Sequence, residues 1–256
     1  MFLRFSLLNA IKEALFPLSC AFCGEQVECC DALCPKCWLS VNFINRNTCK
    51  YCGAATNDEL QQQKYNPHPS FQCCYSCAKI AKAQPEQNEI LASVLYDNFI
   101  KKFILKFKNK KEIRLANLFA KLFHKEDFQG VDYVIPVPIH PKKLYKRTYN
   151  QAALLVFALQ RLYDDFPAVE LNLLKKTRFT GSQKGKNMLE RRKNIAGSFV
   201  VTEAGKKLIP GKIIAVVDDV AASGATLLEC RRELRKAGAN EVRCVALARS
   251  LPVPRR

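Results

Sequence analysis

The chain has 256 residues, of which 48% are hydrophobic, so it can bury a real core, which argues against wholesale disorder. The formal net charge is +18, and the excess lies entirely in residues 79–256, which hold 35 Lys/Arg against 17 Asp/Glu, since residues 1–78 hold 6 of each. Such a basic segment favours anionic partners such as phosphorylated metabolites, nucleic acid or an acidic surface, although many of its lysines can equally form a solvated surface.

The first 18 residues are expected to form an amphipathic helix that Pro17 ends. Arg4, Lys12 and Glu13 interrupt its apolar run and no small-residue cleavage site follows, so a secretory signal peptide is not indicated. No stretch of the sequence approaches the length of a membrane span without interruption. We expect this helix to dock on the protein itself rather than to lie on a membrane or insert into it.

Cysteine is concentrated near the start of the chain, where residues 20–77 hold 11 of the 13 cysteines. An odd number of cysteines arranged in C-x-x-C pairs favours metal thiolates in a reducing cytosol over a secreted disulfide framework, so a cytoplasmic protein is expected. Two pairs make one tetrahedral four-thiolate site, so the chain can hold one or two Zn²⁺ ions. The four pairs are Cys20/Cys23, Cys34/Cys37, Cys49/Cys52 and Cys74/Cys77.

These zinc sites are predicted to be structural, because four thiolates leave no open position for a substrate. By proximity in the sequence we pair the first two knuckles with each other and the last two with each other, although interleaved pairing is an alternative and Cys73 can replace Cys74. Gly24 and Gly53 follow the second cysteine of their pairs, where a knuckle often needs a positive φ. So small a module cannot fold on apolar burial alone, so zinc would supply its folding free energy.

Two polar stretches are expected to be irregular: residues 56–70 as an insertion in the cysteine module, and residues 79–89 as a linker. From residue 90, predicted strands and helices alternate, which favours an α/β domain with a mostly parallel sheet. The expected strands are 91–96, 132–138, 213–217 and 241–248. The expected helices are 97–124, with a break near 108–110, then 150–163 and 226–237.

The most informative segment is the predicted strand 213–217 and the turn after it. Asp218 and Asp219 end a buried apolar strand, and small residues then lead to Thr226, which starts a helix. Ligands of parallel α/β sheets bind at the carboxyl ends of strands, and a helix N-terminus preceded by small residues can hold a phosphate. The carboxylates can accept hydrogen bonds from sugar hydroxyls and help to hold Mg²⁺. An ordinary βα turn and a receiver-type phosphoacceptor site are the alternatives, and no G-x-G-x-x-G or Walker motif is present.

This segment resembles the loop that binds phosphoribosyl pyrophosphate (PRPP) in type I phosphoribosyltransferases. The resemblance implies the type I fold, a mostly parallel sheet flanked by helices, with PRPP and Mg²⁺ as ligands. In that family the two acids, here Asp218 and Asp219, bind the ribose hydroxyls, and the turn binds the 5-phosphate. The matching turn residues are Val220, Ala221, Ala222, Ser223, Gly224, Ala225 and Thr226, with Ala222-Ser223 where two threonines are common.

Two basic segments are candidates for the rest of such a site. Residues 134–140 (VIPVPIH) read as a short strand entering a proline-stiffened turn, and the cations that follow can clamp pyrophosphate. Residues 175–194 are basic and hydrophilic, as expected of a flap that stabilises the charge developing on departing pyrophosphate. A basic surface loop and a solvated disordered loop are the alternatives. The candidate cations are Lys142 and Arg147 in the first segment, and Arg191 and Arg192 in the second.

Motifs in order along nearly the whole chain resemble the ComF family of competence-associated, phosphoribosyltransferase-like proteins. They are Leu95-Tyr96-Asp97, Lys106-Phe107-Lys108, residues 136–141, Arg147 with Asn150-Gln151, Gln183 with Arg191-Arg192 and Asn194, and Asp218-Asp219. The resemblance implies a double zinc ribbon at residues 19–78 and a phosphoribosyltransferase-like domain at residues 90–256, after the helix at 1–18 and the linker at 79–89. The sequence departs from the family at Thr148, where Gly is usual, and in the long insertion at 56–70.

Two functions follow from the resemblance. The first is an enzyme that transfers the ribosyl phosphate of PRPP to an acceptor that the sequence does not identify. The second is a non-catalytic, PRPP-sensing protein that binds single-stranded DNA, since ComF-like proteins are linked to natural transformation and DNA uptake. Residues 101–111 interleave cations with Phe103 and Phe107, which suits base stacking, although apolar residues at helical spacing are more often core. The expected partners are therefore PRPP and, in the second case, single-stranded DNA and the uptake machinery, and no oligomeric state is indicated.

Overall fold

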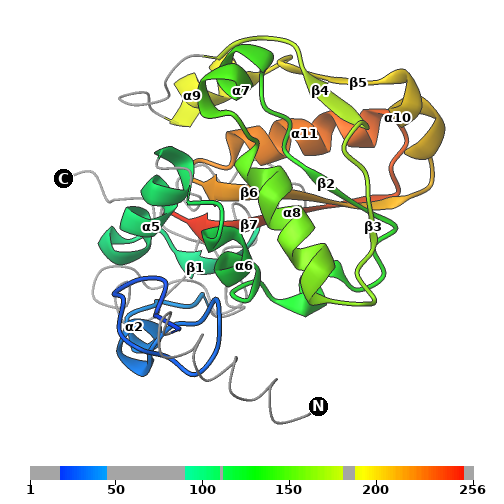
Figure 1. Ribbon diagram of the computed structural model, residues 1–256. Helices are drawn as coiled ribbons and strands as arrows, with labels where there is room; N and C mark the ends of the chain where they lie inside the picture. The colour runs from blue at the N-terminus through cyan, green and yellow to red at the C-terminus, as the bar shows by residue number, and fades with distance from the viewer. Residues whose placement is uncertain (1–17, 45–89, 110–111, 181–187, 251–256) are drawn as a thin grey trace, which may run out of the picture.

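The structure, a computed structural model, describes residues 18–44, 90–109, 112–180 and 188–250 (Figure 1). Among those described residues, every helix is too short or too polar to cross a membrane. The predicted features outside the described residues are the N-terminal helix, Gly53, the insertion at 56–70, the linker at 79–89, and the second set of knuckles with Cys49, Cys52, Cys73, Cys74 and Cys77.

The centre of the molecule is a five-stranded sheet in the order β1-β7-β6-β2-β3, with every neighbouring pair parallel. The central strands are buried on both faces, which suits their near-continuous apolar, β-branched sequences. The predicted parallel α/β sheet is therefore confirmed. The strands are β1 (Leu91–Leu95), β2 (Tyr133–Pro136), β3 (Ala168–Val169), β6 (Ile213–Ala221) and β7 (Glu241–Arg249).

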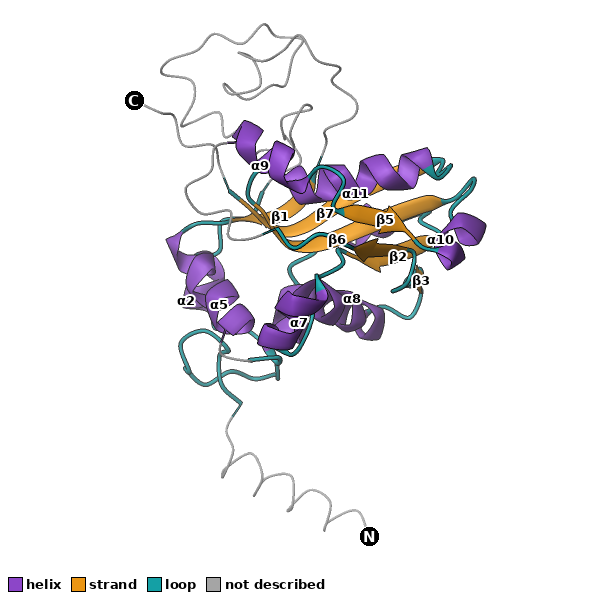
Figure 2. Cartoon of the chain, turned by 90° about the horizontal axis from the view of Figure 1, so that it is seen from above, coloured by secondary structure: helices purple, strands orange, loops and turns teal. Residues whose placement is uncertain are grey.

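Helices cover both faces of this sheet, as Figure 2 shows. One face carries α5 (Asn98–Asn109), α7 (Pro141–Arg147) and α8 (Gln151–Leu162), with α6 (Leu115–Ala120) packed against α8. The other face carries α9 (Met188–Ile195) and α11 (Ala225–Lys236). The smaller elements are the 3₁₀ helix η2 (Lys125–Phe128), α10 (Glu203–Leu208), and an antiparallel pair, β4 (Leu174–Lys176) with β5 (Phe199–Val201), of which β5 packs on α11.

The start of α8 is tied to the end of β2 by a single side chain. Asn150 is the N-cap, and its Oδ1 accepts a hydrogen bond from the N–H of Ala152 (3.1 Å), which satisfies one of the helix's orphan donors. Its Nδ2 donates to the carbonyl of Val137 (3.0 Å), just beyond β2. The N-terminus of α8 is thereby fixed at the carboxyl edge of the sheet.

The predicted strand at 213–217 is longer in the structure, where it forms β6. Its prediction ended at residue 217, but the strand continues to Ala221 because β7 goes on pairing with it, through Val220↔Ala248 and Ala221↔Arg249. The helix predicted for 97–124 is two helices, as its predicted break near 108–110 suggested. The short elements β3, β4, β5, α7, α9 and α10 were not predicted, because two to eight residues carry too little periodicity to be recognised.

The base-stacking interpretation of residues 101–111 is wrong for its aromatic residues. Phe103 and Phe107 lie on the buried side of α5, with 6% and 0% of their surfaces exposed, and they belong to the main hydrophobic cluster. Phe107 packs edge-on against Phe119 of α6, with ring centroids 5.5 Å apart. The amphipathic spacing of this segment serves the core, and its rings cannot stack on nucleic-acid bases.

The described part of the cysteine module, residues 18–44, packs directly on the α/β domain and includes α2 (Pro35–Leu39). Backbone hydrogen bonds join it to the edge of β1: Ile44 N–H donates to Ser93 O (2.9 Å), and Leu95 N–H donates to Asn42 O (2.8 Å). One hydrophobic cluster runs from Cys20 and Phe22 in the module into the sheet at Val94. The module and the sheet domain therefore share one core.

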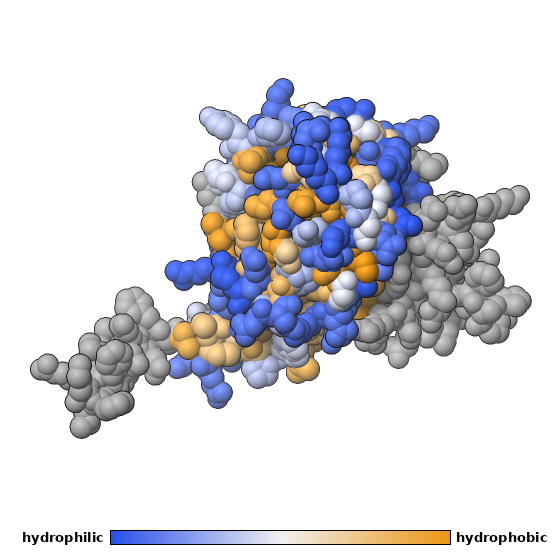
Figure 3. Space-filling view, turned by 90° about the vertical axis from the view of Figure 1, so that its right-hand side faces the viewer, coloured by the Kyte–Doolittle hydropathy of each residue, from blue (hydrophilic) through white to orange (hydrophobic). Residues whose placement is uncertain are grey.

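One side of the described surface is mainly hydrophilic (Figure 3). Figure 3 views the side that lies on the right in Figure 1, where hydrophilic residues dominate and apolar residues gather across the middle. Exposed apolar residues are common on folded proteins, so this band does not by itself indicate a partner.

Candidate functional site

The predicted phosphate-binding turn joins the carboxyl end of β6 to the N-terminus of α11. Gly224 is the N-cap of α11 and has a φ of +70°, a conformation that glycine adopts without the strain of an L side chain. The Oγ of Ser223 accepts a hydrogen bond from the N–H of Ala225 (3.5 Å). A cavity of about 310 Å³ opens here, and every residue from Asp218 to Thr226 lines it. The first-turn N–H groups of α11 therefore lie where an anion would be stabilised.

The two adjacent carboxylates differ in their surroundings. Asp219 is buried, and its Oδ2 lies 2.9 Å from the Nζ of Lys108, at the end of α5. Asp218 is half-buried, and its Oδ1 accepts the backbone N–H of Asp219 (2.9 Å). Burial, followed by the charge of Asp219, raises the pKa of Asp218 to about 7. The carboxyl of Asp218 therefore sits close to a change of charge at neutral pH, and a bound cation or hydroxyl donor would favour its ionised form.

Cations surround the rest of the same cavity. Its lining includes Lys108, Lys143, Arg147, Lys176 and Arg191, against the two carboxylates. The pKa of Lys143 is lowered by partial desolvation and then by the neighbouring cations, Arg147 first among them. The pKa of Lys176 is also lowered, mainly by desolvation. Cations that crowd one another in this way are stabilised by a polyanionic ligand, so the cavity suits a molecule carrying more than one phosphate.

A buried amide completes this wall. Gln151 begins α8, lines the cavity and is only 3% exposed. Its Oε1 accepts a hydrogen bond from Nη1 of Arg147 (3.1 Å), while its Nε2 has no partner among the described residues. A buried unsatisfied donor is costly, so a ligand acceptor in this cavity would relieve it.

The structure brings most of the predicted site residues together, with two exceptions. The acid pair, the turn residues 220–226, Arg147 and Arg191 all line one cavity. Lys142 is exposed and is not part of that lining, and Arg192 lines a separate groove between α9 and α11. Both differences follow from helix geometry, because consecutive helical residues point about 100° apart.

The lining residues that were not among the predicted site residues include Lys108, Lys143, Lys176 and Gln151. Two of them stand in the quoted ComF motifs, so a signal for Lys108 and Gln151 was present in the sequence. The two ends of the predicted flap at 175–194 form regular secondary structure, namely β4 and α9. Residues 181–187 lie outside the described chain. Nη2 of Arg178 joins these ends by donating to the carbonyls of Asn194 (2.8 Å) and Ala196 (2.7 Å).

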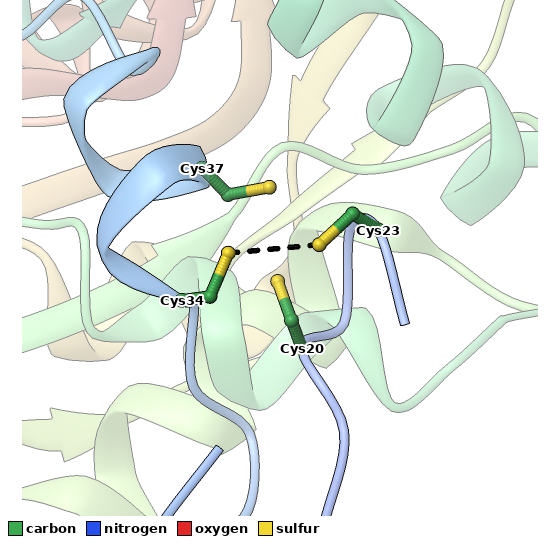
Figure 4. A group of neighbouring side chains, drawn as sticks. All are labelled: Cys20, Cys23, Cys34 and Cys37. Atoms are coloured by element: carbon green, nitrogen blue, oxygen red, sulfur yellow. Dashed lines mark hydrogen bonds between the residues drawn. The ribbon is translucent and has the colours of Figure 1, made fainter. Parts of the chain in front are cut away.

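Far from this cavity along the chain, four cysteines form a second candidate site. Their Sγ atoms point toward one centre, two from the loop before α2 and two from α2 and its N-cap (Figure 4). All four lie within 4.8 Å of one another, and the Sγ atoms of Cys23 and Cys34 are 3.6 Å apart. Zn–S bonds of about 2.3 Å in a tetrahedron place sulfurs about 3.8 Å apart, so the geometry suits zinc. The four residues are Cys20, Cys23, Cys34 and Cys37, the first two predicted knuckles.

The ionisation of these thiols also indicates a cation. Burial works against the thiolate of Cys20, but backbone hydrogen bonds from Cys23, Cys34 and Phe22 outweigh it and lower its pKa to about 6. Burial and the neighbouring thiols raise the pKa of Cys37. Four thiolates can therefore form together only around a positive ion. Gly24 has a φ of +83°, as predicted for the residue after the second cysteine of a knuckle.

Comparison with known proteins matches both parts of the chain. Residues 152–251 match the phosphoribosyl transferase domain, and residues 11–78 match the double zinc ribbon domain. Competence protein F of Haemophilus influenzae is 27% identical over 244 residues, which cover 92% of this chain and 98% of that protein. Competence protein ComFC of Streptococcus pneumoniae is 28% identical over 155 residues, 60% of this chain and 65% of that protein. The chain is similar to ComF-family proteins over nearly its whole length. DNA utilization protein YhgH of Escherichia coli K12 is also similar, at 24% identity over 86% of this chain and 97% of that protein.

The chain combines a type I phosphoribosyltransferase domain with an N-terminal zinc-ribbon module. The match to the double zinc ribbon and the cluster of four thiols support structural zinc, and the cluster joins the first two knuckles as the predicted pairing requires. With all four positions taken by thiolates, that ion would stabilise the module and bind no substrate.

The departure from the ComF pattern at Thr148 has a conformational cost. Thr148 ends α7 in the left-handed region, with a φ of +69°, where a β-branched residue is strained and glycine is not. We expect Thr148→Gly to raise the free energy of unfolding by about 1 kcal/mol, as measured by urea denaturation. Thr177→Gly is the matched control, because Thr177 has no positive φ, and it should lower stability instead. An unchanged or lower stability for Thr148→Gly would contradict the strain.

Proposed function

We propose that this phosphoribosyltransferase-like ComF protein binds Mg²⁺·PRPP in the cavity between β6, α8 and α11. The 5-phosphate would bind to the turn 220–226 and the N-terminus of α11. The ribose hydroxyls would donate hydrogen bonds to Asp218 and Asp219. The observation that carries the proposal is that one cavity unites a phosphate-type turn, an acid pair and five cations. When bound with PRPP, Mg²⁺ would neutralise pyrophosphate oxygens near the two carboxylates.

The cationic wall supports a role in transfer as well as in binding. In the proposed reaction an acceptor nucleophile forms a bond to C1 of the ribose while the C1–O bond to pyrophosphate breaks, and pyrophosphate leaves with the electron pair. Arg147, Lys143, Lys176 and Arg191 would stabilise the negative charge that grows on the leaving group. The Nε2 of Gln151 would donate to the same group.

Calorimetric titration of Mg²⁺·PRPP into the full, zinc-loaded chain tests this proposal. We expect one site per chain, affinity that depends on Mg²⁺, and weaker binding of ribose 5-phosphate or pyrophosphate alone, because each occupies only half of the cavity. Release of pyrophosphate on addition of a candidate acceptor would then identify the transferase activity. A folded, zinc-loaded protein that takes up none of the three ligands would overturn the proposal.

The raised pKa of Asp218 predicts a pH dependence of binding. Since Mg²⁺ and hydroxyl donors favour the carboxylate, the affinity for Mg²⁺·PRPP should rise with pH and level off above about pH 7. Calorimetry between pH 5.5 and 8.5 would measure it. Asp218→Asn is the control, because its weaker binding should follow only the ionisation of the ligand's own phosphates. A wild-type profile identical to that of the variant would contradict the prediction.

The same pKa has the opposite effect on the stability of the ligand-free protein. The folded-state pKa of Asp218 lies above its unfolded value of 3.8, so the neutral carboxyl favours the fold. That contribution is fully present below about pH 4 and is lost as the pH rises through about 7.

A link to DNA uptake or utilisation is the second part of the proposal. It is supported by the similarity to proteins named competence protein F and DNA utilization protein. A cytoplasmic location suits the free thiols of the described cysteines. Because Phe103 and Phe107 are buried, single-stranded DNA would have to bind through cations elsewhere on the surface. Fluorescence anisotropy with labelled single-stranded DNA, over a range of salt and with and without PRPP, tests for a PRPP-sensing binding protein.

A further inference from the structure

One aromatic side chain of the zinc module inserts into the α/β domain. Phe22 lies between the zinc ligands Cys20 and Cys23 and is 8% exposed. Its ring stacks on that of Phe103 in α5, with centroids 3.5 Å apart and an interplanar angle of 10°. It also meets Phe99 edge-on at 5.5 Å. Because cysteines bound to one metal flank Phe22 on both sides, the metal would set the direction in which this ring points.

The same module also holds the N-terminus of α5. Asp97 precedes the helix, and its Oδ1 accepts the N–H of Ile100 (2.9 Å), as an N-cap residue does. The other carboxylate oxygen, Oδ2, accepts a hydrogen bond from Nδ2 of Asn42 (2.6 Å), which belongs to the module. The module therefore contacts α5 at its first turn and again at Phe103.

The far end of α5 reaches the cavity. Lys108 lies five residues after Phe103, about 7.5 Å along the helix axis, and its Nζ is 2.9 Å from Oδ2 of Asp219. The carbonyl of the fully buried Phe107 accepts a hydrogen bond from the hydroxyl of Tyr149. A helix is stiff over this length, so the contacts on its first half set where Lys108 lies.

We propose that Phe22 is a positioning residue for the ligand cavity: the zinc-bound knuckle holds α5 through the Phe22–Phe103 stack, so that Lys108 stays paired with Asp219. The proposal builds on the proposed PRPP site and assigns a role in it to the zinc module. It implies that loss of zinc weakens the binding of Mg²⁺·PRPP, although none of the four cysteines lies in the cavity lining.

Phe22 could stabilise the fold without positioning Lys108. The apparent pKa values of the two aspartates distinguish these two roles. Lys108 lowers the pKa of Asp218, together with Lys143, whereas burial and Asp219 raise it, and Lys176 also faces this carboxyl. If Lys108 moves away, the apparent pKa values of the pair must rise. General destabilisation of the fold would not produce that shift.

The experiment compares the full chain with Phe22→Ala, Phe22→Leu, Lys108→Met and the double variant Phe22→Ala/Lys108→Met. The readouts are the apparent pKa values of the acid pair, from ¹³C NMR of labelled aspartate in the ligand-free protein, and the Kd of Mg²⁺·PRPP. Phe166→Ala is the matched control, because Phe166 packs on Phe128 just before β3, at the end of the sheet away from the cavity. Zinc content is measured for every variant.

We expect Phe22→Ala to raise the apparent pKa values and to weaken Mg²⁺·PRPP binding by roughly 10-fold, a typical size for coupling between sites. Phe22→Leu should restore most of both, and the double variant should be no worse than Lys108→Met, because both changes act on one contact. Removing zinc with a chelator should reproduce the shift in wild type but add nothing to Lys108→Met. Phe166→Ala should lower stability alone.

Unchanged pKa values in a folded, zinc-loaded Phe22→Ala protein would overturn the inference, as would additive effects in the double variant. The two proposals can fail separately. If wild type does not bind Mg²⁺·PRPP, the proposed function fails, whereas the NMR titration still decides whether Phe22 positions Lys108.

Discussion

Replacing both Asp218 and Asp219 with asparagine is expected to abolish measurable binding of Mg²⁺·PRPP while the protein remains folded. Asparagine keeps the shape of each side chain but removes the charge that would hold ribose hydroxyls and assist Mg²⁺. Hydrogen bonds to charged groups contribute about 1.5–3 kcal/mol each, so losing two should weaken binding roughly 100-fold or more. Calorimetric titration measures the loss, and thermal unfolding confirms the fold.

The chain supplies a matched control for this double substitution. Asp164 and Asp165 are also adjacent, but they are exposed and follow α8 at the opposite end of that helix from the cavity. Asp164→Asn/Asp165→Asn removes the same charge and should leave the affinity unchanged. If the two double variants bind Mg²⁺·PRPP equally well, the acid pair has no role in binding.

Substituting Gly224 with alanine is expected to have the second-largest effect, because it acts on conformation and on space together. A Cβ at Gly224 would lie 2.3 Å from Cδ1 of the fully buried Ile90 and 3.3 Å from Nη1 of Arg249, and the φ of +70° disfavours any L side chain. The two penalties together amount to roughly 2–4 kcal/mol. The turn would have to move, so Mg²⁺·PRPP binding should be lost as well. Urea denaturation and calorimetry measure the two effects.

Gly130→Ala separates these two causes. Gly130 has nearly the same φ, +69°, but a Cβ there would meet nothing within 4 Å. Its substitution should therefore cost only the conformational part, about 1 kcal/mol, and leave binding intact. Equal losses of stability in the two variants would show that the close contact with Ile90 is relieved at no cost.

Local patterns were sufficient to predict the α/β class and the phosphate-type turn. The apolar run 213–217, the two acids and the small residues before Thr226 are contiguous, so strand, turn and helix could be recognised without knowledge of the rest of the fold. The knuckle Cys20–Cys23 and its partner Cys34–Cys37 were similarly readable, because zinc ligation imposes a fixed local spacing.

Tertiary packing alone decided which cations reach the acid pair and how the zinc module relates to the cavity. Lys108 and Asp219 are 111 positions apart in the sequence but 2.9 Å apart in space, because α5 crosses the carboxyl edge of the sheet. From the sequence, Lys142 rather than Lys143 was predicted to lie in the site, and Arg192 was included. A run of cations does not reveal which way each side chain points on a helix. The Phe22–Phe103 stack was likewise invisible, because contacts between segments depend on how helices pack rather than on any local pattern.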